Sequence, residues 1–309
     1  MNKPLELTVV MYHYIRDPGD AAEVGSGISG MSVRAFEAQL DELSKQYTFV
    51  TWPDVRRAVQ GKSPLPSSAC LLTFDDGMRD HYLNVFPILS NRNVSGLFFV
   101  LARSGEEGLA LGHKIHHLLA KLDEDGLREA IWEMLDSLQR ERFLLAEKHY
   151  QGVLSPSIDR EIDLLKAVLQ RDLSNEAGSL LSELFEMHIG SEKEAARSFY
   201  LNPDQIREMS AAGMHFGGHS HSHPWFDWID VEQRKFEIRA SARLLSQVEP
   251  GPWAFAYPYG GLCGDAPEML ETDGFIAAFT TQTQLRHPDP YLIGRLDGEE
   301  LASEGQGYA

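Results

Sequence analysis

Three short stretches, far apart in the chain, carry residues whose types and spacing suit hydrolysis at a metal ion. Residues 73–77 read TFDDG and hold two adjacent carboxylates, while residues 219–224 read HSHSHP and hold two imidazoles four residues apart. Residues 256–260 read AYPYG and form a turn anchored by proline. Two imidazoles and one carboxylate can bind a divalent metal with room left for water. A second carboxylate beside them can accept a proton from that water.

Each pattern also has a simpler interpretation. Asp75 and Asp76 repel each other at the end of an apolar run, and a cation would relieve this repulsion. Adjacent aspartates are nevertheless common on surfaces. His219 and His223 share one side of a helical turn, whereas His221 would point away. Two histidines at this spacing often have no metal, so the prediction depends on the combination.

The composition excludes some classes of partner. The chain has 309 residues, is 43% hydrophobic and carries a formal charge of −18. This acidity argues against binding to nucleic acid or to an anionic membrane, because both need basic patches. The two cysteines, Cys70 and Cys263, fit free thiols in a reducing cytosol better than a disulfide framework, and a single disulfide stays open.

No segment predicts export or membrane insertion. The apolar run at residues 7–14 is too short to span a membrane and lacks a small-residue cleavage site. No apolar stretch approaches eighteen residues. We therefore expect a soluble, cytoplasmic protein with no membrane span.

Apolar runs that resemble strands alternate with helical patterns. The expected strands are residues 7–14, 47–52, 70–74, 96–101, 214–218, 253–257 and 275–280. The expected helices are residues 32–47, 79–91, 203–212, 230–248 and 265–273, with Ser32 as an N-cap. This order predicts an α/β fold with a parallel sheet, closed or nearly closed into a distorted (β/α) barrel. Asp75, His219 and Pro258 each follow a strand, where barrel enzymes place catalytic residues.

One long segment departs from this alternation. Residues 103–200 have little β character and many apolar residues at helical spacing, with a break at residues 155–157. We expect a discontinuous barrel domain at 1–102 and 201–298, a helical insertion at 103–200 and a loose tail at 299–309.

Together the motifs resemble the polysaccharide deacetylases of carbohydrate esterase family 4, the NodB-homology domain. That family's first motif, T-F-D-D-G, is matched at every position, and its second, H-[S/T]-x-x-H, is matched at 219–223. The third, R-x-P-Y-G, is matched at 258–260 without its arginine. The resemblance covers residues 5–101 and 201–297 and leaves the insertion outside.

The resemblance implies a role for each matching residue. Asp75 would be the catalytic base, and Asp76, His219 and His223 would bind the metal. The backbone N–H of Tyr259 would hold the oxyanion, and Pro258 would shape the groove. Zinc is the expected ion, with cobalt, nickel or manganese as alternatives.

Two parts of the family's site lack a clear match. Ala256 stands where the arginine that orients the base is expected; Arg295 could reach the same place, or could form a structural salt bridge. The motif that carries the acid histidine is also absent, and His13 or His287 could replace it.

Other patterns have weaker claims to function. Residues 25–30 fit G-x-G-x-x-G but do not follow a strand directly, so we expect a flexible loop. His113 and His117 are interpreted as a polar helix face rather than as a second metal site. His215 is expected to pack or to form hydrogen bonds.

The sequence thus predicts a metal-dependent deacetylase that removes an N- or O-linked acetyl group from a sugar. The expected substrate is a soluble or lipid-linked intermediate of surface-glycan assembly. The alternatives are a hydrolase of a non-sugar amide or cyclic imide on the same fold, and a non-catalytic glycan-binding protein. The particular acetyl group and the oligomeric state stay open.

Overall fold

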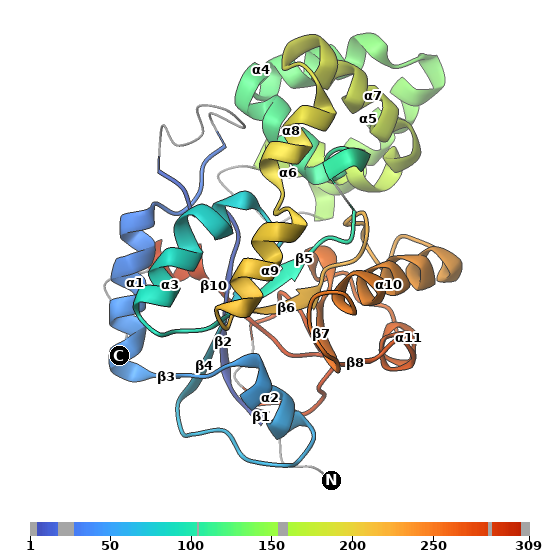
Figure 1. Cartoon of the computed structure of the whole chain (residues 1–309). Helices are drawn as coiled ribbons and strands as arrows, with labels where there is room; N and C mark the ends of the chain where they lie inside the picture. The colour runs from blue at the N-terminus through green and yellow to red at the C-terminus, as the bar shows by residue number, and fades with distance from the viewer. Residues whose placement is uncertain (1–4, 18–27, 104, 154–159, 284–285, 304–309) are drawn as a thin grey trace.

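A curled parallel sheet forms the centre of the protein (Figure 1). The computed structural model describes residues 5–17, 28–103, 105–153, 160–283 and 286–303. The strands of the main path run in the order β10–β2–β4–β5–β6–β7–β8, and β3 pairs beside β4. Their bounds are β2 Thr8–Tyr12, β3 Thr48–Phe49, β4 Ala69–Phe74, β5 Gly96–Val100, β6 His215–Gly218, β7 Trp253–Ala256, β8 Phe275–Phe279 and β10 Leu296–Asp297. The expected strands are confirmed, although β3 is shorter than residues 47–52.

The chain that follows β8 nearly closes the sheet into a barrel. Ile293 pairs in parallel with Phe279 of β8, and Leu296 of β10 pairs in parallel with Val10 of β2. One short segment therefore bridges the two edges of the sheet. This closure confirms the expected distorted (β/α) barrel.

Alternate strand residues pack into two different cores. Val9 and Leu71 belong to an apolar cluster that spans the strands, together with Trp52 of α2 (Trp52–Val59). Their neighbours Val10 and Leu72 belong to a second cluster, which includes residues of the surrounding helices. Because both faces are buried, the strands read as continuous apolar runs in the sequence.

The helices around the barrel begin where polar side chains can cap them. Ser32 caps α1 (Val33–Gln46) by accepting a hydrogen bond from the N–H of Ala35, as expected. Asn202 and Asp230 form capping boxes at α9 (Pro203–Ala211) and α10 (Val231–Leu245). The other expected helices are η1 (His81–Val85) leading into α3 (Phe86–Asn91), and α11 (Ala266–Thr272).

Helix α2 was not expected from the apolar pattern. Trp52 seemed to extend the preceding strand, but it is the first residue of the helix. Thr51 and Asp54 form a capping box there. The capping residues Thr51 and Asp54 therefore indicate where the strand ends and α2 begins better than the apolar residues do.

The expectation of a loose tail from residue 299 is wrong for the part of the tail that the structure describes. Residues Gly298–Ser303 form helix α12. The backbone oxygen of Gly298 accepts a hydrogen bond from buried Gln39 at 2.9 Å. Leu301 packs against the apolar cluster that contains Val10 and Leu72. These contacts hold α12 against the barrel, while residues 304–309 lie outside the described residues.

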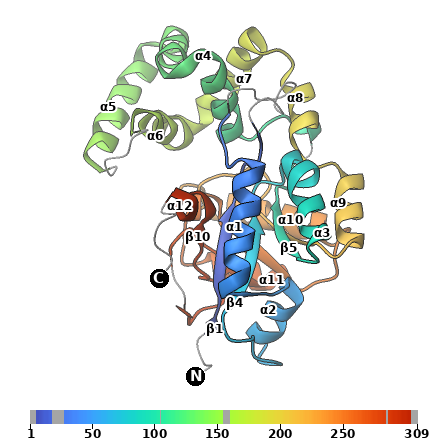
Figure 2. The same cartoon turned by 90° about the vertical axis from the view of Figure 1, so that its left-hand side faces the viewer.

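The segment at 103–200 is helical, as expected, and lies over one end of the barrel (Figures 1 and 2). Its elements are η2 Gly105–Glu107, α4 Leu111–Met134, α5 Ser137–Val153, α6 Arg160–Ala167, η3 Val168–Asp172, α7 Ser174–His188 and α8 Glu192–Phe199. The expected break at 155–157 lies outside the described residues. We call residues 103–200 the helical segment.

The helical segment has a core of its own that continues into the barrel rim. Leu118, Ile131 and Leu181 are fully buried in it. Tyr14 and Met78, which follow β2 and β4, belong to the same cluster. The helical segment is therefore packed onto the strand ends that carry the candidate site.

Candidate metal centre

Neighbouring strand ends bring the predicted residues together. Asp75 and Asp76 directly follow β4. His219 directly follows β6, and Tyr259 lies in the 3-10 turn η4 (Pro258–Gly260) after β7. Since β4, β5, β6 and β7 are consecutive and parallel in the sheet, these ends share one rim.

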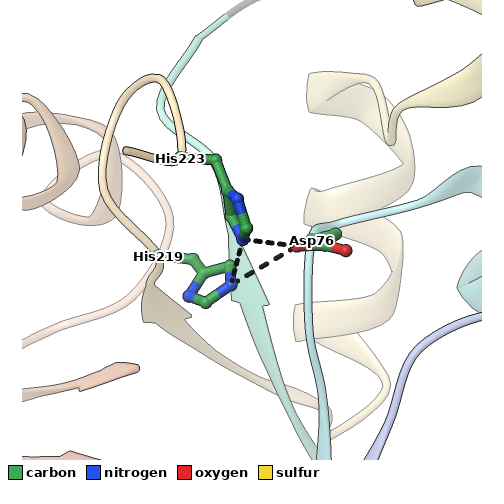
Figure 3. A group of neighbouring side chains, drawn as sticks. All are labelled: Asp76, His219 and His223. Atoms are coloured by element: carbon green, nitrogen blue, oxygen red, sulfur yellow. Dashed lines mark hydrogen bonds and ion pairs between the residues drawn. The ribbon is translucent and has the colours of Figure 1, made fainter. Parts of the chain in front are cut away.

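Asp76, His219 and His223 converge on one point (Figure 3). Oδ1 of Asp76 lies 3.3 Å from Nε2 of His219 and 3.3 Å from Nε2 of His223. The two Nε2 atoms are 3.1 Å apart. Because all three ligand atoms lie within 4.8 Å of one another, a single cation could contact each of them.

The environment of Asp76 fits a divalent cation. The residue is 5% exposed, and among the described residues its Oδ1 has no hydrogen-bond partner. A buried carboxylate oxygen without a partner is costly unless a positive charge lies beside it. Burial works to raise the pKa of Asp76, but His113 and His223 hold it well below its usual value. The carboxylate is thus kept ionised, as a metal ligand must be.

The backbone orients His219 as a ligand. Its Nδ1 donates to the backbone oxygen of Ala256 at 2.8 Å, so Nε2 faces Asp76. Burial works to lower the pKa of His219, but Asp75 and Asp76 outweigh it and raise the pKa. Burial lowers the pKa of His223 to about 4. With the Nδ1 proton engaged by Ala256, Nε2 is the nitrogen of His219 that can bind a metal.

The two histidines do not share a helical turn, which corrects that part of the prediction. Residues 219–223 form an irregular loop. Ser220 and His223 have φ values of +67° and +63°, and the Ser220 hydroxyl accepts a hydrogen bond from the His223 N–H at 2.9 Å. Two left-handed residues thus reverse the chain and return His223 to His219. Such backbone is strained for residues other than glycine and is typical of functional sites.

Glu237 of α10 holds this loop from behind and was not anticipated. Its Oε2 accepts hydrogen bonds from the N–H groups of His221 and Ser222 at 2.6 and 2.8 Å. Its Oε1 accepts one from the Ser222 hydroxyl at 2.6 Å. The His221 ring points away from the metal ligands, as expected, and pairs with Glu107 at 3.0 Å.

Arg295 pairs with Asp75. Its guanidinium makes two hydrogen bonds to the Asp75 carboxylate, at 2.7 and 2.8 Å. Arg295 is 1% exposed and Asp75 is 2% exposed. Burial works to raise the pKa of Asp75, but Arg295 overcomes it and lowers the pKa below its usual value. The pair keeps an ionised carboxylate next to the candidate metal ligands.

The two candidate acid histidines lie in different places. Nε2 of His13 is 3.9 Å from Oδ2 of Asp75, and the side chain is 38% exposed. His287 is buried in β9 (Arg286–His287), where it contacts the backbone of Leu7 and Gly294. Leu7 precedes β2, so His287 lies at the opposite end of the barrel. Of the two, only His13 is near the site.

His113 belongs to the site, which corrects the expectation of a polar helix face. Its Nε2 lies 3.1 Å from Oδ2 of Asp76, and its Nδ1 lies 2.7 Å from the hydroxyl of Tyr200. His117 is also buried and contacts the backbone oxygen of His113 at 2.7 Å. Helix α4 begins close to the end of β5, and this topological proximity to the rim was the signal available in the sequence.

Tyr259 forms a wall of the site. Its backbone has a φ of +55°. Its ring packs edge-on against His223, with centroids 4.4 Å apart, and stacks on Trp225 at 4.6 Å. A cavity of about 300 Å³ lies beside these rings, between the barrel and the helical segment, and is lined by residues of both.

The remaining expectations have mixed outcomes. His215 pairs with Glu249 at 2.9 Å, as expected for a residue that forms hydrogen bonds. Cys70 and Cys263 are free thiols. Most of the G-x-G-x-x-G stretch lies outside the described residues. In the described parts of the chain, no helix is both long enough and apolar enough to cross a membrane.

Comparison with known proteins agrees with the motifs and the geometry. The family model described as polysaccharide deacetylase matches residues 62–144 and 181–276, which is more than half of the chain. The chain belongs to the polysaccharide deacetylase family. The match enters the helical segment from both sides, so the segment is not wholly outside the family's pattern.

A curated relative matches over a shorter region. The protein YxkH of Bacillus subtilis (strain 168), whose name places it among the polysaccharide deacetylases, is 31% identical over 121 residues. This match spans 38% of the present chain and 37% of YxkH.

Several solved structures have a similar fold along nearly the whole chain. The Streptococcus pyogenes deacetylase PplD, solved in complex with acetate, has a TM-score of 0.57 and 18% identity, covering 97% of this chain and 98% of PplD. IcaB from Ammonifex degensii has a TM-score of 0.55 and 20% identity, covering 99% of both chains. A de-N-acetylase from Aggregatibacter actinomycetemcomitans has a TM-score of 0.55 and 16% identity, covering 95% of both. At these identities the likeness shows the fold alone.

Proposed function

We propose that this protein is a metal-dependent deacetylase that removes an acetyl group from an N- or O-acetylated sugar. One observation carries the proposal: a buried carboxylate–imidazole group, formed by Asp76, His219 and His223, lies beside a second carboxylate that is held ionised. Zinc suits this ligand set, with cobalt, nickel or manganese as alternatives. Membership of the family supports the same activity.

The proposed reaction is attack of water on the acetyl carbonyl. When bound, the metal would supply Lewis-acid polarisation of the water and the carbonyl. Asp75 accepts the proton of the attacking water, and Arg295 keeps that carboxylate ionised and in one orientation. The backbone N–H of Tyr259 donates to the oxyanion that develops on the former carbonyl oxygen.

His13 is the proposed acid for the leaving sugar. It is the partly exposed histidine beside Asp75, at 3.9 Å. A protonated imidazole there would give its proton to the sugar nitrogen or oxygen as the bond to the acetyl carbon breaks. Acetate and the deacetylated sugar are the products.

A short glycan is the proposed substrate, as a soluble or lipid-linked intermediate of surface-glycan assembly in the cytoplasm. The helical segment lies over the rim, and the ligands Asp76 and His219 are 5% and 1% exposed. A covered site of this kind favours a chain end or a small sugar over the interior of a polymer.

Acetate release by zinc-loaded protein tests the proposal. We expect release from short acetylated sugars, faster than from acetylated polymer, and a loss of about 10²–10⁴-fold in kcat for Asp75→Asn with zinc content unchanged. Exposed Asp204→Asn is the matched control and should keep full activity. Ring opening of cyclic imides without acetate release, or full activity in Asp75→Asn, would overturn it.

A further inference from the structure

The helical segment contributes side chains that hold the metal ligands in place. His113 of α4 is 3% exposed, and its Nε2 lies 3.1 Å from Oδ2 of Asp76. The other oxygen of the same carboxylate, Oδ1, faces His219 and His223. His113 thus contacts the side of Asp76 that points away from the candidate metal position.

A chain of hydrogen bonds sets the direction of this contact. The N–H of Ala110 donates to the hydroxyl oxygen of Tyr200 at 2.9 Å. The ionised Asp76 carboxylate can only accept, so Nε2 of His113 carries a proton, and the Tyr200 hydroxyl can donate to Nδ1, 2.7 Å away. With Nδ1 accepting, the neutral ring carries its proton on Nε2 and donates it to Asp76. Tyr200, held by the N–H of Ala110, and Asp76 thus favour the same tautomer of His113.

Tyr200 is itself anchored next to the motif aspartates. It forms an antiparallel bridge with Met78, and the N–H of Leu201 donates to the backbone oxygen of Gly77 at 2.9 Å. The end of the helical segment is thus tied to the loop that carries Asp76.

A second set of contacts supports the opposite side of the site. The Arg171 guanidinium lies 3.8 Å from the centre of the Trp225 ring, and Gln170 accepts a hydrogen bond from the indole N–H of Trp225 at 3.1 Å. The other face of Trp225 stacks on Tyr259, which packs against His223. Helical-segment residues therefore lie behind two of the three metal ligands.

We propose that the helical segment is a working part of the metal centre, in which His113 is a positioning residue that fixes Asp76 for metal binding. The inference rests on the proposed metal-dependent function. It predicts that metal binding and docking of the helical segment stabilise each other, because any coupling between two equilibria is reciprocal. Outer contacts of this kind typically change metal affinity by about 10–100-fold.

Zinc affinity, measured by competition with a chelator, tests the role of His113. We expect His113→Leu to weaken zinc binding about 10–100-fold. His113→Gln keeps a donor near the position of Nε2 and should restore much of the affinity. Tyr200→Phe removes the hydroxyl that sets the tautomer and should weaken binding less than His113→Leu. His221→Leu is the matched control, because this histidine lies between two ligands but points to Glu107.

Hydrogen exchange of the wild-type protein tests the reciprocal effect. Zinc should slow amide exchange in α4, and this protection should be reduced in His113→Leu and kept in His221→Leu. The measurement on wild-type protein stands even if one variant folds poorly. Unchanged zinc affinity in folded His113→Leu would overturn the inference. So would an amide exchange rate in α4 of the wild type that is the same with and without zinc.

These results separate this inference from the proposed function. If His113→Leu binds zinc like the wild type while the wild type releases acetate, the inference fails and the deacetylase proposal stands. If His113→Leu loses zinc affinity but the wild type releases no acetate, the inference stands and the deacetylase proposal fails.

Discussion

At the residue scale, the Asp75–Arg295 pair joins two buried charges that lie 220 positions apart in the chain. The two side chains are joined by two hydrogen bonds, and neither is more than 2% exposed. Such a pair contributes less to stability than its contacts suggest, because both charges lose hydration. Removing one partner is expensive, because the other charge then stays buried alone. The arrangement keeps the Asp75 carboxylate ionised rather than making the fold more stable.

Arg295→Met should therefore lower the free energy of unfolding by about 3–5 kcal/mol. It should also raise the pKa of Asp75, since the guanidinium that lowers it is gone, and move the acid limb of the activity profile to higher pH. Urea unfolding and pH–rate profiles measure the two effects. Lys45→Met, which breaks an exposed pair with Glu42, should cost no more than about 1 kcal/mol.

The double variant Arg295→Met/Asp75→Asn completes the cycle. The double variant should lose clearly less free energy of unfolding than the two single variants lose in sum, because it leaves no unpaired charge buried. Additive losses would contradict the idea that Arg295 acts through Asp75.

At the scale of elements, two helices determine where the loop residues lie. Glu237 of α10 binds the N–H groups of His221 and Ser222. The start of α4 places His113 on Asp76, and the next turn places His117 against Phe185 and Phe199. Because His117 is buried among rings, it is neutral in the folded protein, and burial lowers its pKa to about 4.

The metal-free protein should therefore lose stability between about pH 6.5 and pH 4. In this window the unfolded chain binds a proton at residue 117 and the folded chain does not, so unfolding is favoured as the pH falls. The positive charge of Arg16 also opposes protonation of His117. His117 alone should contribute about 3 kcal/mol of this loss.

Urea unfolding of metal-free protein at several pH values provides the measurement. His117→Leu should show a shallower decline between pH 6.5 and 4, whatever its absolute stability. His188→Leu, at an exposed position on α7, should keep the wild-type slope. An unchanged slope in His117→Leu would rule out the buried neutral histidine as the cause.

At the scale of the whole molecule, barrel and helical segment share the site. The core of the helical segment includes Tyr14 and Met78 of the barrel rim. The candidate metal ligands follow strands β4 and β6, and His113 of the helical segment contacts one of them. A ligand that binds there should stabilise the fold as one unit, since it binds only when all the parts are assembled.

Zinc at about 100 times its dissociation constant should stabilise the protein by about 2.7 kcal/mol and raise Tm by about 4–8 °C. Thermal unfolding with zinc and with chelator measures the shift. Asp76→Asn should show almost no zinc-dependent rise, whereas exposed Asp204→Asn should respond like the wild type. An equal rise in Asp76→Asn would place the zinc elsewhere.

The sequence by itself determined the barrel strands and the rim positions of Asp75, His219 and the turn at Pro258. Apolar runs mark buried parallel strands, and the carboxyl ends of such strands meet at one rim whatever the details of packing. The apolar runs in the sequence are therefore enough to predict that the motif residues lie together at one rim of the barrel.

Only the tertiary structure decided which residues support those motifs. Arg295 is 220 positions from Asp75, and His113 is 37 positions from Asp76. The residues next to an arginine or a histidine in the sequence do not indicate which side chain it will contact. That contact depends on its long side chain and on how distant elements pack. The left-handed backbone at Ser220 and His223 is likewise set by the contacts that hold the loop. The structure thus placed Arg295 against Asp75, His113 against Asp76 and His287 at the far end of the barrel.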